Sequence, residues 1–453
     1  MKSRLAQLIE HLSAGLVERD TQVRLALLAA LSGEHLLLIG PPGTAKSDLA
    51  RRLAGVFHDA HYFERLLTRF SVPEELFGPL SLSALEEDRY ERQIDGYLPT
   101  ATIAFIDEIF KANSAILNAL LTLLNEREFD QGRGRIRTPL VSVIAASNEI
   151  PAEDFLAAFY DRFLLRCQVK PVSDEGFVRL LNLSEHGRQT VPRELQIGRN
   201  DLDRLLMERE RVTVPAEVMV MLTDLRGFLA REEILLSDRR WRKMLGVLKT
   251  AALTNGRNAV SIWDLWLTQF CACERPEQAG LVAGWFGSRL GTWKVMNPVR
   301  FTHLIEAFEA QLELEQNAND LAFDDSGKLA MAQSVGGAEA GDVAPRLSSF
   351  MRRRRYGAVH VHARVDQSQD LINQIDAYLA EIGRYMDSLS ASVADHLWIA
   401  PDFAASGHAS LQATREVVFA LRVRCAAVRQ GFFGLPQLER DPGGVPEPMA
   451  ASA

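Results

Sequence analysis

The segment from Gly40 to Ser47 restricts the fold of this chain more than any other part of the sequence. It lies between the apolar run His35–Ile39 and the helix-prone stretch Ser47–Phe57. A buried strand that leads through a glycine-rich loop into a helix places the free N–H groups of the first helical turn at the loop, where they bind anions. The segment therefore predicts a phosphate-binding loop, and it reads Gly40-Pro41-Pro42-Gly43-Thr44-Ala45-Lys46-Ser47.

One position of this loop departs from the usual pattern G-x-x-x-x-G-K-[ST], because Ala45 stands where the second glycine is expected. In a loop of this type Lys46 contacts the β- and γ-phosphates, and the hydroxyl of Ser47 ligates Mg²⁺. Taken alone, the segment is also compatible with a simple turn between a strand and a helix. Residues elsewhere in the chain favour the phosphate-binding interpretation.

Two further predicted strands end in polar residues. Thr102–Asp107 (TIAFID) leads into the pair Asp107-Glu108, and Val141–Ser147 (VSVIAAS) is followed by Asn148. The carboxyl ends of parallel strands form the ligand-binding edge of such a sheet. There Asp107 can hold Mg²⁺, and Glu108 can orient and deprotonate an attacking water. The amide of Asn148 is placed to sense the γ-phosphate, so the expected cofactors are ATP or ADP with Mg²⁺.

Strands that alternate with helices predict a parallel α/β sheet. The fold class expected is a P-loop parallel-sheet core, an all-helical lid, and a C-terminal helical bundle with a short β-containing insertion. The predicted boundaries are the core at 1–190, the lid at 191–275, the bundle at 276–440 with its insertion at about 320–366, and a disordered tail at 441–453. A linker is expected from Arg275 to Pro298.

Composition excludes several classes of protein. The net charge of −8 argues against a nucleic-acid-binding surface, and four scattered cysteines are too few for a disulfide framework. Residues 1–22 lack the cationic start and apolar block of a signal peptide. No run approaches the roughly 18 apolar residues that a membrane span needs. We therefore expect a cytoplasmic protein.

With the loop, the acid pair and Asn148 in this order, the chain resembles the AAA+ superfamily. It is most similar to the MoxR group, whose loop reads G-P-P-G-x-A-K-S, so Ala45 is expected in that group. Within the group it resembles the RavA subfamily over roughly residues 10–275. The stretches that carry this resemblance are GLVERD (15–20), LLAALSGE (27–34), TRFSVPEELFGPLS (68–81), IDEIFKANSAILN (106–118), AASNEIP (145–151), YDRFLLR (160–166) and SDRRWRK (237–243).

The resemblance implies a homo-hexameric ring with its sites between subunits. Arg162 matches the family's arginine finger, which would reach the γ-phosphate held by the neighbouring subunit. Arg239 matches the second sensor on the lid, and its neighbour Arg240 is an equally close candidate. A surface salt bridge is the alternative role for each arginine.

The resemblance also implies two structures at the ring pore. The stretch Glu75–Thr100 is similar to the helix-2 insert of this clade, which is usually a β-hairpin. Gly132–Arg137 (GRGRIR) is similar to the hairpin before the first sensor. Its three arginines suggest a surface for an acidic partner, and a solvated hairpin is the equal alternative.

The C-terminal region departs from the RavA pattern. The relatives carry a small β-rich domain that contacts a lysine decarboxylase, whereas the corresponding insertion here is short and rich in Gly and Ala. We therefore do not expect a decarboxylase interaction. The alternation in Ala358–Val365 predicts a strand with His360 and His362 on one face. A metal site would need a further ligand, so these histidines are interpreted as exposed strand residues.

Three functions remain open from the sequence. The first is a chaperone-like ATPase that hydrolyses ATP to ADP and phosphate and remodels a protein client with a von Willebrand factor A-domain partner, as the resemblance implies. The second is a nucleic-acid motor, which the net charge and the lack of a DNA-binding module oppose. The third is an ATP-binding switch with little turnover.

Overall fold

The computed structural model describes residues 1–132, 134–150, 156, 159–183, 190–273, 275–289, 298–321 and 351–438. The chain forms two compact units. Unit 1 comprises Met1–Ser288 and Leu389–Gly407, and unit 2 comprises Arg289–Ser388 and His408–Ala453. The predicted disordered tail at 441–453 lies outside the described residues, as does most of the predicted insertion.

Unit 1 contains a five-stranded parallel sheet with the order β2-β3-β6-β1-β7, so the parallel α/β prediction is confirmed. Ile39, at the end of β1, lies opposite Ser147 of β6, and Ile106 of β3 lies opposite Ala145 of β6. The ends of these three central strands therefore meet at one edge of the sheet. The strands are β1 (Leu36–Ile39), β2 (Tyr62–Leu66), β3 (Ile103–Asp107), β6 (Ser142–Ser147) and β7 (Leu165–Gln168).

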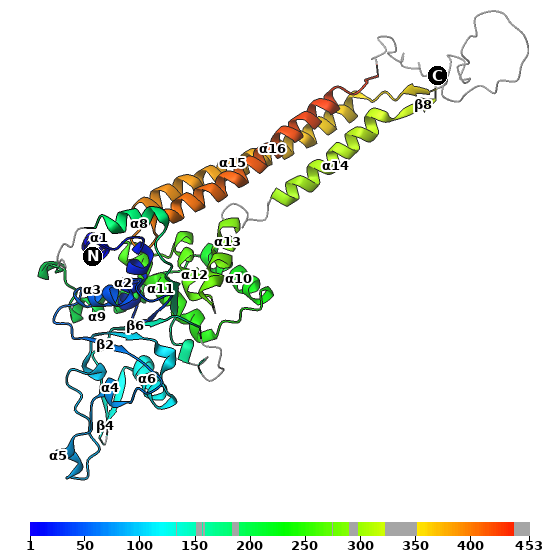
Figure 1. The fold of residues 1–453 in the computed structure, drawn as a ribbon. Helices are drawn as coiled ribbons and strands as arrows, with labels where there is room; N and C mark the ends of the chain where they lie inside the picture. Colours follow the sequence, from blue (N-terminus) through cyan, green and yellow to red (C-terminus); the bar gives the residue numbers. More distant parts are fainter. Residues whose placement is uncertain are drawn as a thin grey trace, which may run out of the picture. The chain divides into compact units, whose positions relative to one another are not determined.

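Helices cover both faces of this sheet (Figure 1). The apolar side chains of α6 (Ser114–Glu126) join the buried cluster that contains Leu37, Ile106 and Ala145. On the opposite side α2 (Asp20–Ser32) and α3 (Lys46–Ala54) pack on the strands, and α1 (Lys2–Ser13) packs on these two helices. Burial on both faces explains why the central strands read as continuous apolar runs.

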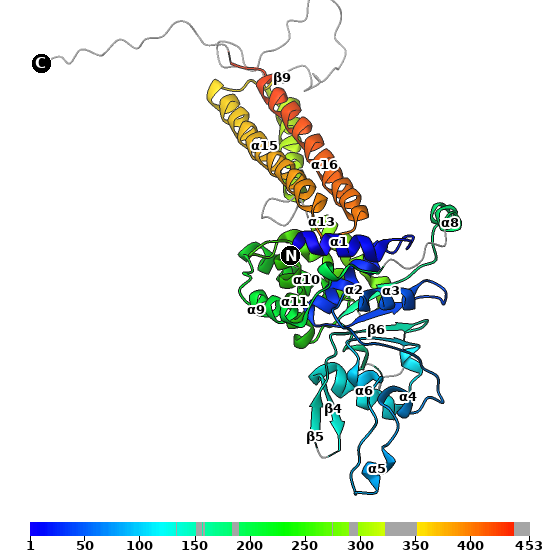
Figure 2. The ribbon, with the colours of Figure 1, turned by 90° about the vertical axis from the view of Figure 1, so that its left-hand side faces the viewer.

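Two extensions project from the same end of unit 1 (Figures 1 and 2). One is the antiparallel hairpin of β4 (Glu128–Gln131) and β5 (Gly134–Arg137), which lies where the sequence predicts a hairpin. The other follows α4 (Glu74–Phe77) and carries the short helix α5 (Leu82–Leu85). The prediction of a β-hairpin here is wrong in detail, because a single bridge between Leu80 and Arg92 is the only strand-like pairing of this extension.

The lid also belongs to unit 1 and is helical. Ser237 caps α11 by accepting a hydrogen bond from the backbone N–H of Arg240. The linker predicted from Arg275 is wrong for its first part, because residues 279–289 form a helix that buries Trp285 and Phe286. The lid helices are α9 (Arg199–Arg209), α10 (Ala216–Arg231), α11 (Asp238–Thr254), the 3-10 helix η4 (Ile262–Leu267), α12 (Thr268–Cys271) and α13 (Ala279–Arg289).

The segment between α15 (Ala358–Ala394) and α16 (Pro401–Phe433) is buried against the C-terminal end of α11. The indole N–H of Trp398 donates to Thr254 Oγ1 at 2.7 Å, and Asn255 Oδ1 accepts from the backbone N–H of Leu397 at 3.0 Å. His396 contacts the fully buried Asp264 at 2.9 Å. A segment distant in sequence therefore completes the lid.

Unit 2 is built on α14 (Pro298–Asn317) together with most of α15 and α16. Its described β-structure is the two-stranded antiparallel ladder of β8 (Asn319–Leu321) and β9 (Met351–Arg353), with three residue pairs. The helical bundle and a short β-containing part agree with the expectation, whereas the strand predicted over Ala358–Val365 is helical. Val361 and Val365 lie one helical turn apart and face the cluster around Phe432, so the alternating pattern is also a helical one.

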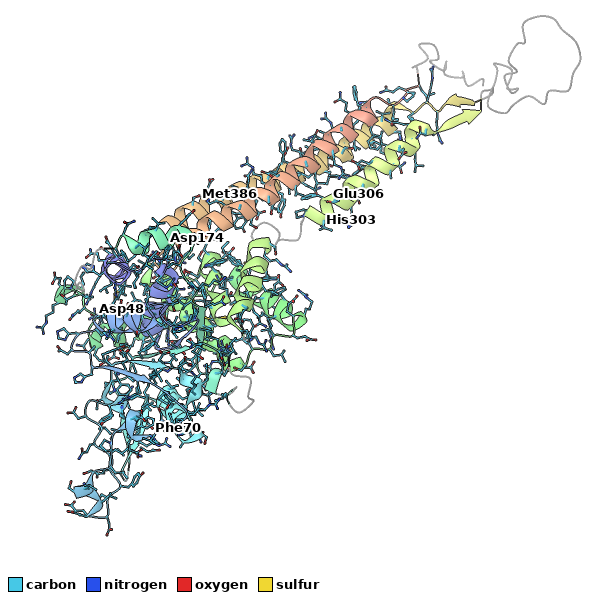
Figure 3. The ribbon with its side chains drawn as sticks, viewed as in Figure 1. Asp48, Phe70, Asp174, His303, Glu306 and Met386 are labelled. Atoms are coloured by element: carbon cyan, nitrogen blue, oxygen red, sulfur yellow. The ribbon has the colours of Figure 1, made fainter. Side chains whose placement is uncertain are left out.

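Side chains elsewhere on the molecule mark its exposed surfaces (Figure 3). Phe70, between β2 and α4, is 90% exposed and is the most exposed large apolar side chain described. His360, predicted to lie on a strand, instead lies on α15 and contacts Glu315 of α14 at 3.0 Å. In the described part of the chain, no group of three or more His, Cys, Asp or Glu side chains is arranged to hold a metal ion.

Candidate nucleotide site

The predicted phosphate loop lies at the end of β1 and leads directly into α3. Gly43 has φ +77° and Ala45, the residue before α3, has φ +65°, so the loop turns through the left-handed region twice. Gly40 packs so closely on the next strand that a Cβ there would lie 2.1 Å from the carbonyl oxygen of Val169. The first glycine is thus required by close approach, whereas alanine at position 45 adopts a strained conformation that glycine would adopt freely.

Lys46 is buried inside this loop, with 7% of its surface exposed. Its Nζ donates to the carbonyl oxygens of Gly40 at 2.7 Å and Pro41 at 2.8 Å. Burial lowers the pKa of Lys46, while the charges of Asp107 and Glu108 raise it. A buried cation at a helix N-terminus is the electrostatic setting in which a polyphosphate binds.

Asp107, Glu108 and Asn148 meet at the same sheet edge, as the strand order requires. Glu108 has φ +52°, a strained value for a side-chain-bearing residue, and its Oε1 accepts from Asn148 Nδ2 at 2.5 Å. Its Oε2 lies 3.3 Å from Nζ of Lys111. Asp107 Oδ1 accepts from the backbone N–H of Glu108 at 3.0 Å. The structure therefore brings Asp107, Glu108 and Asn148 together, with Lys46 close enough to feel the charges of both acids.

A cavity of about 340 Å³ opens beside the loop. Sequence reasoning missed its other wall, which is made by the connection between α1 and α2 and by the segment that follows β7. Arg19 joins these parts, because its guanidinium donates to the carbonyls of Thr44 at 3.2 Å and Lys170 at 2.9 Å. The wall is lined by Gly15, Leu16, Val17, Arg19, Pro171, Val172 and Leu180, which suit a flat aromatic base.

Arg162 and Arg239 form a second cluster that shares no described hydrogen bond or ion pair with the first. Burial lowers the pKa of Arg162, and the positive charge of Arg239 lowers it further, so the two guanidiniums lie near each other. The closest ionic contact of Arg162 is to Asp161 at 3.9 Å, and its Nε is buried with no partner among the described residues. Arg239 donates to the side chain of Asn125.

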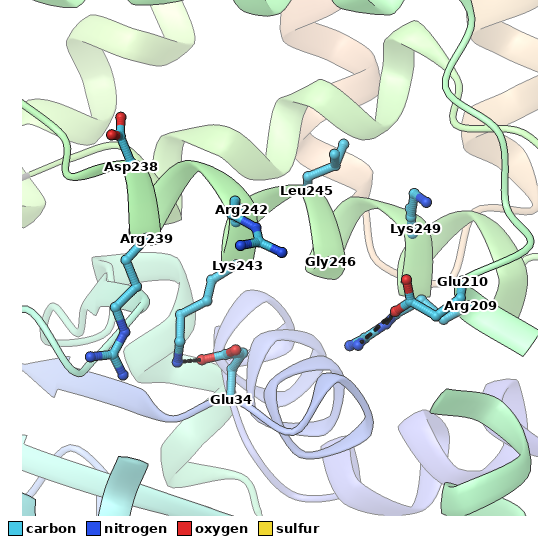
Figure 4. A pocket seen from close by; sticks show the side chains of 10 residues that line it. All are labelled: Glu34, Arg209, Glu210, Asp238, Arg239, Arg242, Lys243, Leu245, Gly246 and Lys249. Carbon is cyan, nitrogen blue, oxygen red and sulfur yellow. Dashed lines mark hydrogen bonds and ion pairs between the residues drawn. The ribbon is translucent and has the colours of Figure 1, made fainter. Parts of the chain in front are cut away.

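Arg239 also lines an open groove of about 660 Å³ on α9 and α11 (Figure 4). Lys243 is paired with Glu34 at 2.5 Å, and Arg209 with Glu210 at 3.1 Å. Asp238 is the remaining acid, against the cations Arg239, Arg242 and Lys249, so the groove is basic. Its lining residues are Glu34, Arg209, Glu210, Asp238, Arg239, Arg242, Lys243, Leu245, Gly246 and Lys249.

Arg240 is placed quite differently from its neighbour. It is 3% exposed, and its guanidinium donates to backbone carbonyls of the segment that carries Arg162 and to that of Cys271. Of the two candidates for the second sensor, only Arg239 therefore has a guanidinium that reaches a groove at the surface. The β4–β5 hairpin offers less basic surface than predicted, because Arg135 is neutralised by Glu126 and Asp130.

Comparison with known families agrees with this arrangement. Residues 3–207 match the profile described as the MoxR domain of MoxR–vWA–beta-propeller ternary systems, and residues 217–286 match an AAA lid domain. The chain belongs to the MoxR family of AAA+ ATPases. The sequence-based assignment to this family and its fold is thus confirmed, and the assignment to the RavA subfamily stays a prediction.

Individual relatives of this MoxR-family chain support the match. Two uncharacterized proteins of Methanocaldococcus jannaschii, MJ0079 and MJ0812, are 41% and 40% identical over 58% and 60% of this chain, and the matches cover 68% and 72% of those proteins. MoxR of Paracoccus denitrificans is 30% identical over 35% of this chain and 48% of its own length. The crystal structure of a candidate ATPase from Cytophaga hutchinsonii shares the fold, with a TM-score of 0.50 and 19% identity over 62% of this chain and 90% of that one.

The donor set fits Mg²⁺ as the partner of a bound nucleotide. Ser47 would supply a hydroxyl oxygen and Asp107 a carboxylate oxygen, and Mg²⁺ typically takes one or two protein oxygens, with water and phosphate oxygens completing its shell. Within the described ranges, no helix is long and apolar enough to cross a bilayer.

Proposed function

We propose that this MoxR-family chain hydrolyses ATP to ADP and phosphate at sites formed between the subunits of a homo-hexameric ring. The observation that carries the proposal is the division of the predicted residues into two clusters. Lys46, Asp107, Glu108 and Asn148 form one, and the described ion pairs bring no arginine to either acid. Arg162 and Arg239 form the other, with little compensation for their charges. A complete site then requires two copies of the chain.

In the proposed site the loop amides and Lys46 hold the β- and γ-phosphates. Mg²⁺, held by Ser47 and Asp107, would neutralise charge on the same phosphates. Glu108 orients the attacking water and accepts its proton. Asn148 lies against Glu108 at 2.5 Å, so it positions the carboxylate and monitors the γ-phosphate side of the site.

Arg162 and Arg239 would act on the nucleotide of the neighbouring subunit. In a phosphoryl transfer the transition state spreads negative charge over the γ-phosphate oxygens, and an arginine supplied in trans stabilises it by roughly 10³-fold or more in rate. The unpartnered Nε of Arg162 and the placement of Arg239 at a groove support this role. We also propose Arg239, not Arg240, as the second sensor.

The coupled process we propose is remodelling of a protein client together with a von Willebrand factor A-domain protein. Its support is that the matching profile describes MoxR domains of MoxR–vWA–beta-propeller systems. Membership of the RavA subfamily, a cytoplasmic location and the absence of a decarboxylase interaction belong to the same proposal. The groove on α9 and α11 is basic, but Lys243 and Arg209 there are paired with acids, and the net charge of −8 opposes a nucleic-acid motor.

Phosphate release by the purified protein tests the proposal. Lys46→Ala should abolish ATP binding, and Glu108→Gln should retain ATP without hydrolysing it and should stabilise the hexamer in analytical ultracentrifugation. Arg51→Ala is the matched control, because Arg51 is a cation of the same helix α3 that pairs with Glu64 at 2.7 Å outside the site. If the protein binds ATP but wild type and Glu108→Gln release phosphate equally slowly, the chain is a low-turnover switch and the proposal is wrong.

A further inference from the structure

The turn that carries Arg162 is held mainly through its backbone carbonyls, and two of its side chains add contacts: the ring of Tyr160 to Arg166, and the carboxylate of Asp161 to Arg240 at 3.5 Å. Arg166, 4% exposed, donates from Nη2 to the carbonyl of Tyr160 at 2.9 Å and from Nε to that of Phe163 at 3.1 Å. Its guanidinium also stacks over the ring of Tyr160 at 3.7 Å. Arg166 thus forms hydrogen bonds to the backbone on both sides of Arg162.

Arg240, on lid helix α11, also forms hydrogen bonds to this turn. Its Nη1 donates to the carbonyls of Asp161 and Phe163, both at 3.2 Å, and its Nη2 donates to that of Leu164 at 3.0 Å. Together the two guanidiniums occupy the carbonyls of residues 160, 161, 163 and 164. The position of Arg162 in space is therefore fixed by two side chains other than its own.

The same two guanidiniums tie the turn to the lid. Arg240 Nη2 donates to the carbonyl of Cys271 at 2.6 Å, and Arg166 Nη1 donates to that of Cys273 at 2.8 Å. Arg240 is also the sequence neighbour of Arg239 in the first turn of α11. The core turn with Arg162 and the lid helix with Arg239 are consequently joined through one residue.

Burying the guanidiniums of Arg166 and Arg240 close together is electrostatically unfavourable, so their presence needs a geometric explanation. Burial lowers the pKa of Arg166 to about 10, and the charge of Arg240 contributes to the shift. Simple packing would be served by apolar side chains, which often replace buried charges without loss of stability. Only the planar guanidinium can bond several carbonyls in fixed directions at once, and lysine cannot reproduce this pattern.

We propose that Arg240 and Arg166 are positioning residues that set Arg162 and Arg239 as one rigid arginine face, which acts on the nucleotide of the neighbouring subunit. The inference rests on the proposed inter-subunit site. Because core and lid are locked together behind this face, the two arginines reach or leave the neighbour's γ-phosphate together. The contact between core and lid therefore prevents the two arginines from moving separately.

Arg240→Met and Arg240→Lys test the inference. Displacement of a catalytic group by about 1 Å costs on the order of 10²-fold in rate. Arg240→Met should therefore lower kcat about 100-fold and leave the Kd for a fluorescent ATP analogue within about threefold, because its own phosphate loop is untouched. Arg240→Lys keeps the positive charge but not the planar set of donors, so it should recover only a small part of kcat. Arg24→Met, which removes a part-buried arginine bonded to the carbonyl of Leu397, is the matched control and should retain kcat within about twofold.

Mixed rings separate positioning from loss of folding. Arg240→Met subunits keep a competent phosphate loop, and Lys46→Ala subunits keep a competent arginine face. An equimolar mixture should therefore hydrolyse ATP faster than either parent, as should Arg162→Ala mixed with Lys46→Ala. If Arg162→Ala is rescued and both Arg240 variants are not, the positioning role is refuted. If Arg162→Ala is itself not rescued, the proposed inter-subunit site is refuted instead.

Discussion

Replacing Trp398 by alanine should destabilise unit 1 by about 4 kcal/mol. Trp398 is 3% exposed, its indole N–H donates to Thr254 Oγ1 at 2.7 Å, and its backbone N–H donates to His396 Nδ1 at 3.2 Å. Truncation of a buried tryptophan to alanine typically costs about 3–5 kcal/mol, through lost apolar burial and the cavity that remains. The cost should fall on the lid, because the segment 396–399 packs against the end of α11.

Trp398→Phe separates the two contributions. Phenylalanine keeps much of the ring contact and removes the N–H donor, while the Thr254 hydroxyl still donates to the carbonyl of Thr250 at 2.7 Å. Because the hydroxyl keeps this bond, the loss should be about 1–1.5 kcal/mol, the net value of one hydrogen bond with a small packing defect.

Urea unfolding without nucleotide, followed by far-ultraviolet circular dichroism, measures both changes as free energies of unfolding. Phe70→Ala is the control, since this side chain is 90% exposed and its removal should change stability by less than about 0.5 kcal/mol. A loss below about 1 kcal/mol for Trp398→Ala would refute the reasoning, as would equal losses for the alanine and phenylalanine variants.

Three further predictions concern acid stability, the loop and the base pocket. Burial lowers the pKa of His396, and the pKa of Asp264 is also lowered, since bonds from His396 and Arg257 outweigh its burial. The unfolded chain therefore binds more protons than the folded one below pH ~6.5. Urea midpoints should accordingly fall as the pH drops from about 6.5 to 3.5, and His396→Gln should flatten the upper part of this decline. Ala45→Gly should raise the free energy of unfolding by about 0.5–1 kcal/mol, because removing the strain of an alanine with positive φ outweighs the conformational entropy that glycine adds to the unfolded state. Thermal unfolding without nucleotide measures this change, and a fall in Tm would contradict the prediction. Leu180→Ala should weaken ATP binding about fivefold and leave kcat unchanged, because it removes roughly 1 kcal/mol of apolar contact to the base. Titration calorimetry measures the Kd, and an unchanged Kd would show that the base binds elsewhere.

Much of the sheet could be predicted because burial on both faces leaves continuous apolar runs. The strands β1, β3 and β6 have this pattern, and each begins one residue after its predicted start and ends at its predicted end. The two outer strands were missed. Tyr62–Leu66 mixes charged and apolar residues at the sheet edge, and Leu165–Gln168 contains the buried Arg166, whose charge is compensated by carbonyls that the sequence does not reveal.

The phosphate loop, Asp107, Glu108 and Asn148 could be predicted because strand order alone brings them to one edge. Which of Arg239 and Arg240 is the better candidate for the second sensor could not be predicted. Adjacent helical residues point about 100° apart, and only the packing of α11 decides which of them faces the core. The base-pocket wall was missed for a related reason, because Gly15–Arg19 reaches the loop through tertiary contacts of Arg19.

The late position of Trp398 in the chain has a consequence for synthesis. The last helix of the lid ends at Arg289, so 109 further residues must be made before Trp398, in the segment that completes the lid, exists. At roughly 5–20 residues per second this takes about 5–20 s. During that interval Asp264 lacks His396, and the apolar site for the indole is open to water and to other nascent chains. Efficient production of this protein should therefore depend on shielding of an unfinished lid, and slow translation through residues 290–398 should raise its aggregation.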